Sequence, residues 1–178
     1  MFKWLTNRSQ LSRTARELYG SVVAQARNPA FYTTLNVADT PEGRYELIAL
    51  HLILTLDRLG APDVADEPLR RATLEAFVTD LDDAMREFGV GVDSVSKRIK
   101  RAAGGVHDRS LTYRTALAEP TNSALETALI KYVYQGHNTV LSQSLAAYVR
   151  AATAALSAQS ADALRQAIIT FPHPDRRS

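Results

Sequence analysis

Apolar residues recur along almost the whole chain every three or four positions, the spacing that places them on one face of an α-helix. No stretch alternates apolar and polar residues in the manner of a half-buried β-strand. Glycine, proline and helix-capping residues mark the boundaries. Together these patterns predict helices over about 9–28, 41–59, 67–88, 92–106, 109–118, 121–135, 138–157 and 160–171. The sequence therefore predicts an all-α fold, a single-domain bundle of about six to eight helices.

The most apolar run of the chain is LIALHLILTL, Leu47–Leu56. A membrane span needs roughly 20 apolar residues, whereas this run is shorter, contains a histidine and has charged residues at both ends. Thr40 is a suitable N-cap for the helix, and Pro41 is suited to its first position. We therefore expect a buried helix over residues 41–59 at the centre of a soluble domain.

The two ends of the chain differ from the domain between them. Residues 1–16 carry four basic side chains and no acidic one, and Trp4 lies among them. We interpret residues 1–8 as a flexible basic N-terminus. An anchor at a membrane interface is the alternative, because tryptophan and arginine suit that boundary. Residues 9–171 form the predicted all-α domain, and residues 172–178 are predicted to be a disordered tail.

Composition excludes several classes of site. The 178-residue chain has no cysteine, which excludes a disulfide framework, a thiolate metal site and a cysteine nucleophile. The formal net charge is only +2, so no specific nucleic-acid partner is expected. The four histidines include no closely spaced metal-binding pair, and neither a metal nor a cofactor is expected. No catalytic constellation emerges from the sequence, which predicts a protein that is not an enzyme.

A change of charge marks the middle of the chain, in DLDDAMREFGVGVDSVSKRIKRAAGG at residues 80–105. Neither a calcium loop nor a dinucleotide or Walker loop fits this stretch. A turn that begins at Gly89 folds two helices back antiparallel, with the acidic end of one beside the basic start of the other. The four basic residues cannot all face the acidic helix, so some are expected to be free for a partner. Partner binding is therefore predicted for Asp82, Asp83, Glu87, Lys97, Arg98, Lys100 and Arg101. Gly104-Gly105 then predicts a kink or the close approach of another backbone.

Several short motifs follow one another between Ala15 and about Tyr113: Asn28-Pro29-x-Phe31-Tyr32, Pro41-x-Gly43-Arg44, His51 and Asp82-Asp83-x-x-Arg86-Glu87-x-Gly89-Val90. In their order and spacing they resemble the ubiquinol–cytochrome c chaperone family, assembly factors of the respiratory cytochrome bc complex. Family members often carry an aromatic-Gly-Arg before a tyrosine, where this chain has Val106-His107-Asp108-Arg109 before Tyr113. The C-terminal third is generic helical sequence.

The resemblance implies an all-α, non-enzymatic and membrane-associated chaperone. Mitochondrial members work with a small partner protein, receive newly made cytochrome b near the ribosomal exit and hold it while haem is inserted. This chain lacks their long targeted N-terminus, so the expected location is the bacterial cytoplasm, including the inner face of the cytoplasmic membrane. The expected partners are cytochrome b or an immature cytochrome bc complex, together with a small partner protein. A scaffold role is implied for Asn28, Phe31, Tyr32, Arg44, His51 and Gly89.

The expected role of His51 differs between the chaperone interpretation and its main alternative. A histidine in so apolar a helix is usually a neutral, hydrogen-bonded core residue, and this interpretation suits the chaperone. A pH-sensitive or haem-facing histidine is the other possibility for the residue. The alternative function is a lipid- or quinone-binding helical protein, whose groove would hold a small apolar molecule with His51 near it.

Overall fold

A computed structural model of the protein describes the backbone of residues 2–87, 92–137 and 140–174, and the side chains of 9–84, 104–137 and 140–174. This part of the chain contains no strand, and the predicted all-α, single-domain class is confirmed. Its helices are α1 (Phe2–Ala26), α2 (Ala30–Thr33), α3 (Pro41–Leu59), α4 (Glu67–Glu87), α5 (Val92–Ala118), α6 (Ser123–Tyr132), α7 (Val140–Ser157) and α8 (Ala161–Arg165).

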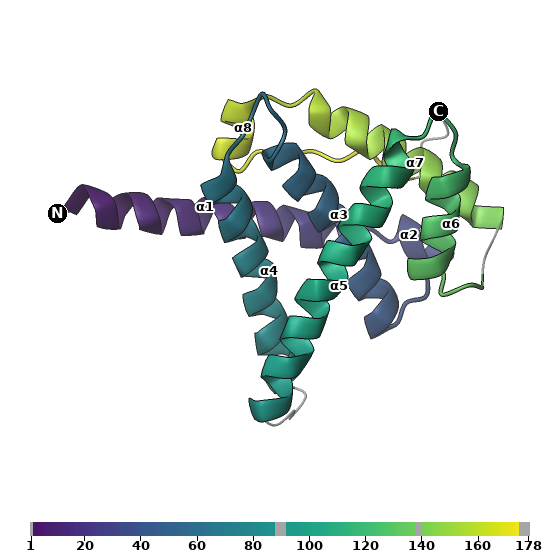
Figure 1. Ribbon diagram of the computed structural model, residues 1–178, viewed down its shortest axis with the longest axis horizontal. Helices are drawn as coiled ribbons and strands as arrows, with labels where there is room; N and C mark the ends of the chain where they lie inside the picture. Colours follow the sequence, from purple (N-terminus) through teal and green to yellow (C-terminus); the bar gives the residue numbers. More distant parts are fainter. Residues whose placement is uncertain (1, 88–91, 138–139, 175–178) are drawn as a thin grey trace.

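Helix α3 is the centre of the molecule, as its apolar sequence predicts. It packs against α1, α4, α5 and α7 (Figure 1), and Leu47, Leu50 and Leu52 are completely buried. The expected start is confirmed, because Thr40 Oγ1 accepts a hydrogen bond from the Gly43 amide at 3.2 Å and Pro41 opens the helix. An apolar surface on nearly every side lets one helix contact four others.

Gly43 fixes how closely α3 approaches the preceding loop, and a substitution tests this. A Cβ atom on Gly43 would lie 2.0 Å from the carbonyl oxygen of Ala38, so backbone would have to move. We expect Gly43→Ala to lower the free energy of unfolding by about 1–3 kcal/mol, measured by urea denaturation. Gly104→Ala is the matched control, because a Cβ there meets nothing within 4 Å and alanine favours a helix. Equal losses in the two variants would contradict this account.

Helices α4 and α5 form an antiparallel hairpin that extends away from the rest of the molecule (Figure 1). This arrangement is the one predicted from the charge pattern. The predicted interruption at Gly104-Gly105 is wrong, because α5 runs unbroken from Val92 to Ala118. No backbone lies against either glycine; a Cβ on Gly105 would instead meet a terminal nitrogen of Arg109 at 2.8 Å. Gly105 therefore makes room for the Arg109 side chain.

Several predicted helix ends need correction. Helix α1 begins at Phe2 rather than Ser9, so residues 2–8 continue the first helix; their predicted flexibility stays a prediction. Helix α6 spans a shorter range than 121–135. Helix α8 ends at Arg165 rather than Phe171, because the chain turns through a left-handed conformation at Ala167 (φ 60°).

The chain after α8 crosses the body without forming a helix. The Gln159 side chain makes hydrogen bonds with the backbone of this segment. Its carbonyl oxygen accepts from the Thr170 amide and its NH2 group donates to the Thr170 carbonyl, both at 2.8 Å. The Pro172 carbonyl accepts from Gln25 at 3.0 Å, and Pro174 is buried. These first residues of the predicted disordered tail are therefore in contact with the domain, while residues 175–178 lie outside the described part.

Candidate partner-binding surface

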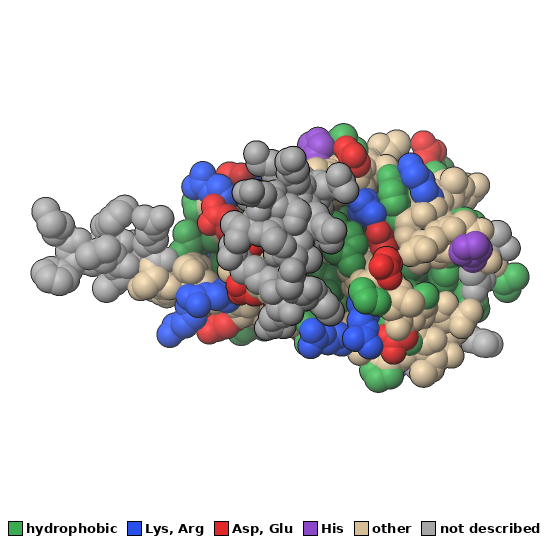
Figure 2. Space-filling view, turned by 90° about the horizontal axis from the view of Figure 1, so that it is seen from below, with side chains coloured by type: hydrophobic (Ala, Val, Ile, Leu, Met, Phe, Trp, Pro, Cys, Tyr) green, Lys and Arg blue, Asp and Glu red, His purple; other side chains and the backbone are tan. Residues whose placement is uncertain are grey.

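The two predicted contact residues with described side chains lie in the last two turns of α4. Asp82 is half-buried and Asp83 is exposed. The side chains of Glu87, Lys97, Arg98, Lys100 and Arg101 lie outside the described side chains, and Gly89 lies outside the described residues. The ion pairing expected across the hairpin therefore stays a prediction. Around the hairpin, blue and red side chains are intermixed rather than separated by sign (Figure 2).

A groove of about 1060 Å³ runs between α1 and α4, and Asp83 is one of its lining residues. Asp83 therefore belongs to a surface shared with α1. Apolar side chains in the groove are Leu11 and Tyr19 from α1 and Pro68, Ala72 and Ala76 from α4. Charged and polar side chains surround these residues, so the groove combines an apolar contact area with a charged rim, a common composition for a protein-binding surface. We call it the α1–α4 groove.

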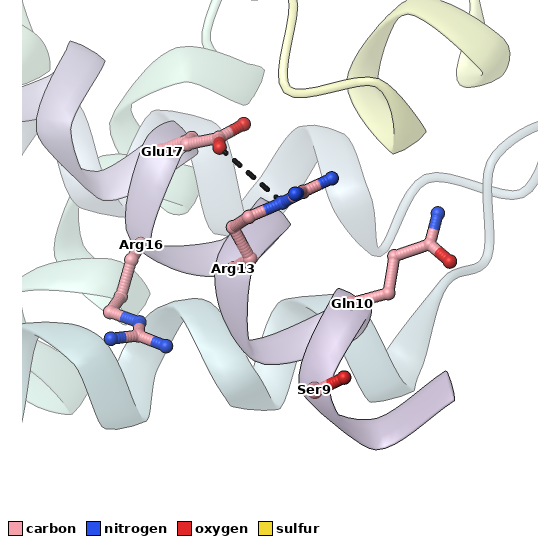
Figure 3. A pocket seen from close by; sticks show the side chains of 5 residues that line it. All are labelled: Ser9, Gln10, Arg13, Arg16 and Glu17. Atoms are coloured by element: carbon pink, nitrogen blue, oxygen red, sulfur yellow. Dashed lines mark ion pairs between the residues drawn. The ribbon is translucent and has the colours of Figure 1, made fainter. Parts of the chain in front are cut away.

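A second depression lies on the outer side of α1 and is a poorer candidate. It is lined by Ser9, Gln10, Arg13, Arg16 and Glu17, all from one helix (Figure 3). An ion pair of 3.7 Å joins Arg13 to Glu17 across one helical turn, and both side chains are largely exposed. Such a pair contributes at most about 1 kcal/mol. The depression offers no apolar surface from a second element and gives no reason to infer a ligand.

The predicted scaffold residues before α3 shape the connection between α1 and α2. The Asn28 side chain accepts from the Ala30 amide at 3.0 Å, and Tyr32 donates to the Ala26 carbonyl at 2.8 Å. Phe31 is completely buried. Arg44 differs from these residues, because it makes an exposed ion pair of 2.7 Å with Asp39. The hydrogen bond from Arg44 lowers the pKa of the Asp39 carboxyl.

His51 is completely buried at the centre of a hydrogen-bonded chain. Its Nδ1 lies 2.7 Å from the Leu47 carbonyl oxygen, which can only accept, so Nδ1 carries the proton. Nε2 then accepts from the Tyr148 hydroxyl at 2.7 Å, and that hydroxyl accepts from Gln25 at 2.9 Å. Burial lowers the pKa of His51 to about 4. The residue is thus a neutral core histidine that links α1, α3 and α7.

The surroundings of His51 leave it no role in the α1–α4 groove. The rings of Phe31 and Phe171 contact the imidazole edge-on, with centroid separations of 5.3 Å for each. Both ring nitrogens are engaged, and His51 is not among the groove residues. The alternative of a lipid or quinone held beside His51 therefore gains no support from this arrangement.

The sequence interpretation missed a buried ion pair between Glu46 and Arg109. Arg109 Nε donates to one Glu46 oxygen at 2.8 Å, a second guanidinium nitrogen donates to the other, and a third donates to the Gly105 carbonyl at 3.0 Å. The guanidinium also lies 4.7 Å from the centroid of the Tyr132 ring. This cluster ties α3 to α5 and α6. Glu46 lies one turn before the buried Leu50 and therefore on the same face of the helix. This spacing in the sequence indicates that the Glu46 carboxylate faces the core.

Two further features bear on the class of protein. Among the described residues, no three histidine or acidic side chains are grouped closely enough to hold a metal ion. Within the same part of the chain, none of the helices combines the length and apolar character of a membrane span. The candidate site of the described helical domain is the surface formed by the α4–α5 hairpin and the α1–α4 groove.

Comparison with known proteins gives the family. The model of the ubiquinol–cytochrome c chaperone family matches residues 33–171, and the chain belongs to that family. The crystal structure of the Cbp3 homolog from Brucella abortus is similar over 100% of both chains, with 30% sequence identity and a TM-score of 0.87. A search of curated proteins finds no match. The family match extends well beyond Tyr113, so the C-terminal third is not generic sequence.

Proposed function

We propose that the chain is a non-enzymatic assembly chaperone for the respiratory cytochrome bc complex, and that it binds newly made cytochrome b. The observation that carries this proposal is the match of the ubiquinol–cytochrome c chaperone family over residues 33–171. The similarity to the Cbp3 homolog along the entire chain supports it. A helical domain that offers a projecting hairpin and an open groove is suited to holding another protein.

The α4–α5 hairpin is the proposed contact region for the client and for a small partner protein. Its position away from the body leaves room for a large partner on either side (Figure 1). The proposed place of action is the bacterial cytoplasm and the inner face of the cytoplasmic membrane. The proposed contact residues are Asp82, Asp83, Glu87, Lys97, Arg98, Lys100 and Arg101.

Capture from native membranes tests the proposal. The tagged full chain, incubated with gently solubilised membranes, is expected to retain cytochrome b, alone or in an immature complex, as identified by mass spectrometry. Reversal of the four bases Lys97, Arg98, Lys100 and Arg101 to glutamate should weaken capture, because charges at a contact surface steer and orient association with a charged partner. Circular dichroism checks that the variant stays folded.

Three outcomes would contradict parts of this proposal. Failure of the unchanged chain to retain cytochrome b would overturn the proposed client. Full capture by the charge-reversed chain at physiological salt would remove these bases from the contact region. A co-purifying isoprenoid or acyl chain, with no cytochrome b, would favour a lipid- or quinone-binding protein instead.

A further inference from the structure

We propose that the α1–α4 groove receives a cationic amphipathic helical segment of the client. The Lys and Arg side chains of that segment would lie beside Asp80 and Asp83, with Glu75 further along the groove. The identity of the client rests on the function proposed above, whereas the chemistry of the occupant is argued from the groove alone. Segments of this kind often flank membrane spans on the cytoplasmic side.

Unmatched carboxylates are the first support. Glu75 and Asp83 are exposed, and neither makes an ion pair with the part of the chain whose side chains are described. Some acids elsewhere on the surface are paired, since Asp57, Asp63 and Asp66 each contact an arginine, whereas Asp108 and Glu119 make no ion pair with the described side chains. Asp80 accepts a hydrogen bond of 2.7 Å from the Tyr19 hydroxyl, which fixes its direction but supplies no positive charge. Among the described lining residues, these three acids are accompanied by two arginines, Arg16 and Arg71, so the sum of their charges is negative.

The position of these acids along α4 is the second support. Asp80 and Asp83 lie within the last two turns of a helix that ends at Glu87. The partial negative charge of a helix C-terminus acts mainly within the last turn, which begins after Asp83. The carboxylates of Asp80 and Asp83 are therefore the main source of negative charge here, and a bound cation would neutralise them.

The size and lining of the groove select a peptide segment over a small molecule. Its lining on α4 extends from Pro68 to Asp83, which corresponds to about 22 Å, or roughly four turns of a docked helix. The volume of about 1060 Å³ lies at the upper limit of the usual range for small-molecule sites, so the length of the lining is what favours a peptide segment. Ala72 and Ala76 are the smallest side chains of the floor, and they let a partner helix approach α4 closely.

Two arginines in the groove limit where the bases of the occupant can lie. Arg71 lies one turn before Glu75 and about three turns before Asp83 on α4, and Arg16 lies one turn before Tyr19 on α1. A segment with bases along its whole length would be repelled by these two arginines. The occupant should therefore carry its bases at the end beside Asp83, and its apolar face should rest on Leu11, Tyr19 and the two alanines.

A binding experiment with a designed probe tests the chemistry. The probe is a synthetic amphipathic peptide of about 18 residues, made of Leu, Ala and Lys with the lysines at one end; its control carries Glu in place of Lys. Fluorescence anisotropy measures binding to the purified full chain. The double variant Glu75→Gln with Asp83→Asn should bind the lysine peptide about fivefold more weakly at low salt. The glutamate peptide should bind poorly to every chain.

A matched variant separates the groove from overall charge. Asp108→Asn with Glu119→Gln removes the same charge from exposed positions outside the groove, and it should bind the lysine peptide as the unchanged chain does. A photocrosslinking residue at Thr79, in the groove, should capture the peptide, whereas one at the exposed Thr115 on α5 should not. Equal loss in both double variants, or capture at Thr115 alone, would overturn the proposal. Crosslinking at Thr79 to a second copy of the chain would overturn it in favour of self-association.

The same double variants distinguish this inference from the proposed function. If the unchanged chain and the Glu75→Gln/Asp83→Asn chain retain equal amounts of cytochrome b, the groove proposal fails and the function stands. If the lysine peptide binds in the groove but no chain retains cytochrome b, the groove proposal stands and the client was misassigned. In the supporting result, the groove variant retains less cytochrome b than the control variant does.

Discussion

Glu46→Ala is expected to lower the free energy of unfolding by about 3–5 kcal/mol, because it leaves the Arg109 guanidinium without its counter-charge among packed side chains. Only 9% of the Glu46 side chain and 18% of the Arg109 side chain are exposed, so water cannot replace the lost partner well. Equilibrium urea denaturation followed by circular dichroism measures the change.

Two comparisons make the cause of this loss specific. Asp57→Ala breaks an ion pair with Arg114 that is more exposed, and it should cost less than about 1 kcal/mol. Glu46→Leu combined with Arg109→Met removes both charges, and it should be more stable than either single change, which a double-mutant cycle reveals. The buried-pair account would be wrong if Glu46→Ala cost no more than Asp57→Ala.

Acidification from pH 7 to pH 4 is expected to remove about 3 kcal/mol of stability through His51 alone. Burial lowers the pKa of His51 in the folded protein from 6.5 to about 4. Below pH 6.5 the unfolded chain binds a proton at this residue that the folded chain does not. The contribution is therefore complete above pH 6.5 and declines as pH falls toward 4, by about 1.4 kcal/mol per pH unit.

Denaturation at several pH values isolates this contribution. His51→Gln removes the titrating group, and its stability should fall less steeply between pH 6.5 and pH 4.5 than that of the unchanged chain, whatever its stability at pH 7. His107→Gln is the control for replacing a histidine, because His107 is exposed on α5. An unaltered slope in His51→Gln would show that His51 does not resist protonation in the folded state.

The two stability predictions concern clusters that hold the candidate surface in place. The Glu46–Arg109 pair joins α3 to α5, which is one arm of the hairpin. The His51 chain joins α3 to α1, which is one wall of the α1–α4 groove. Both clusters are anchored on α3, so this buried central helix holds both parts of the surface in position.

The candidate surface was predicted from sequence only in part. The change from acid to base across Gly89 indicated a helical hairpin with an exposed end, and the described backbone has that hairpin. Asp82 and Asp83 were predicted as contact candidates because an acidic–basic hairpin can form the charged rim of a binding groove, and this role stays a prediction. The groove was not predicted, because it forms where α1 and α4 cross, and their lining residues are far apart in the sequence.

The sequence by itself determined the class of fold, the course of α3 and the hairpin. The signals for these features lie within one or two helical turns, so a short stretch of sequence is enough to recognise them. They are the spacing of apolar residues, the Thr40 cap and Pro41. Only the tertiary structure decided that α5 continues through Gly104-Gly105, that α8 stops at Arg165 and that Glu46 meets Arg109. These outcomes depend on contacts between residues distant in sequence, whose free energies outweigh local preferences of about 1 kcal/mol per residue.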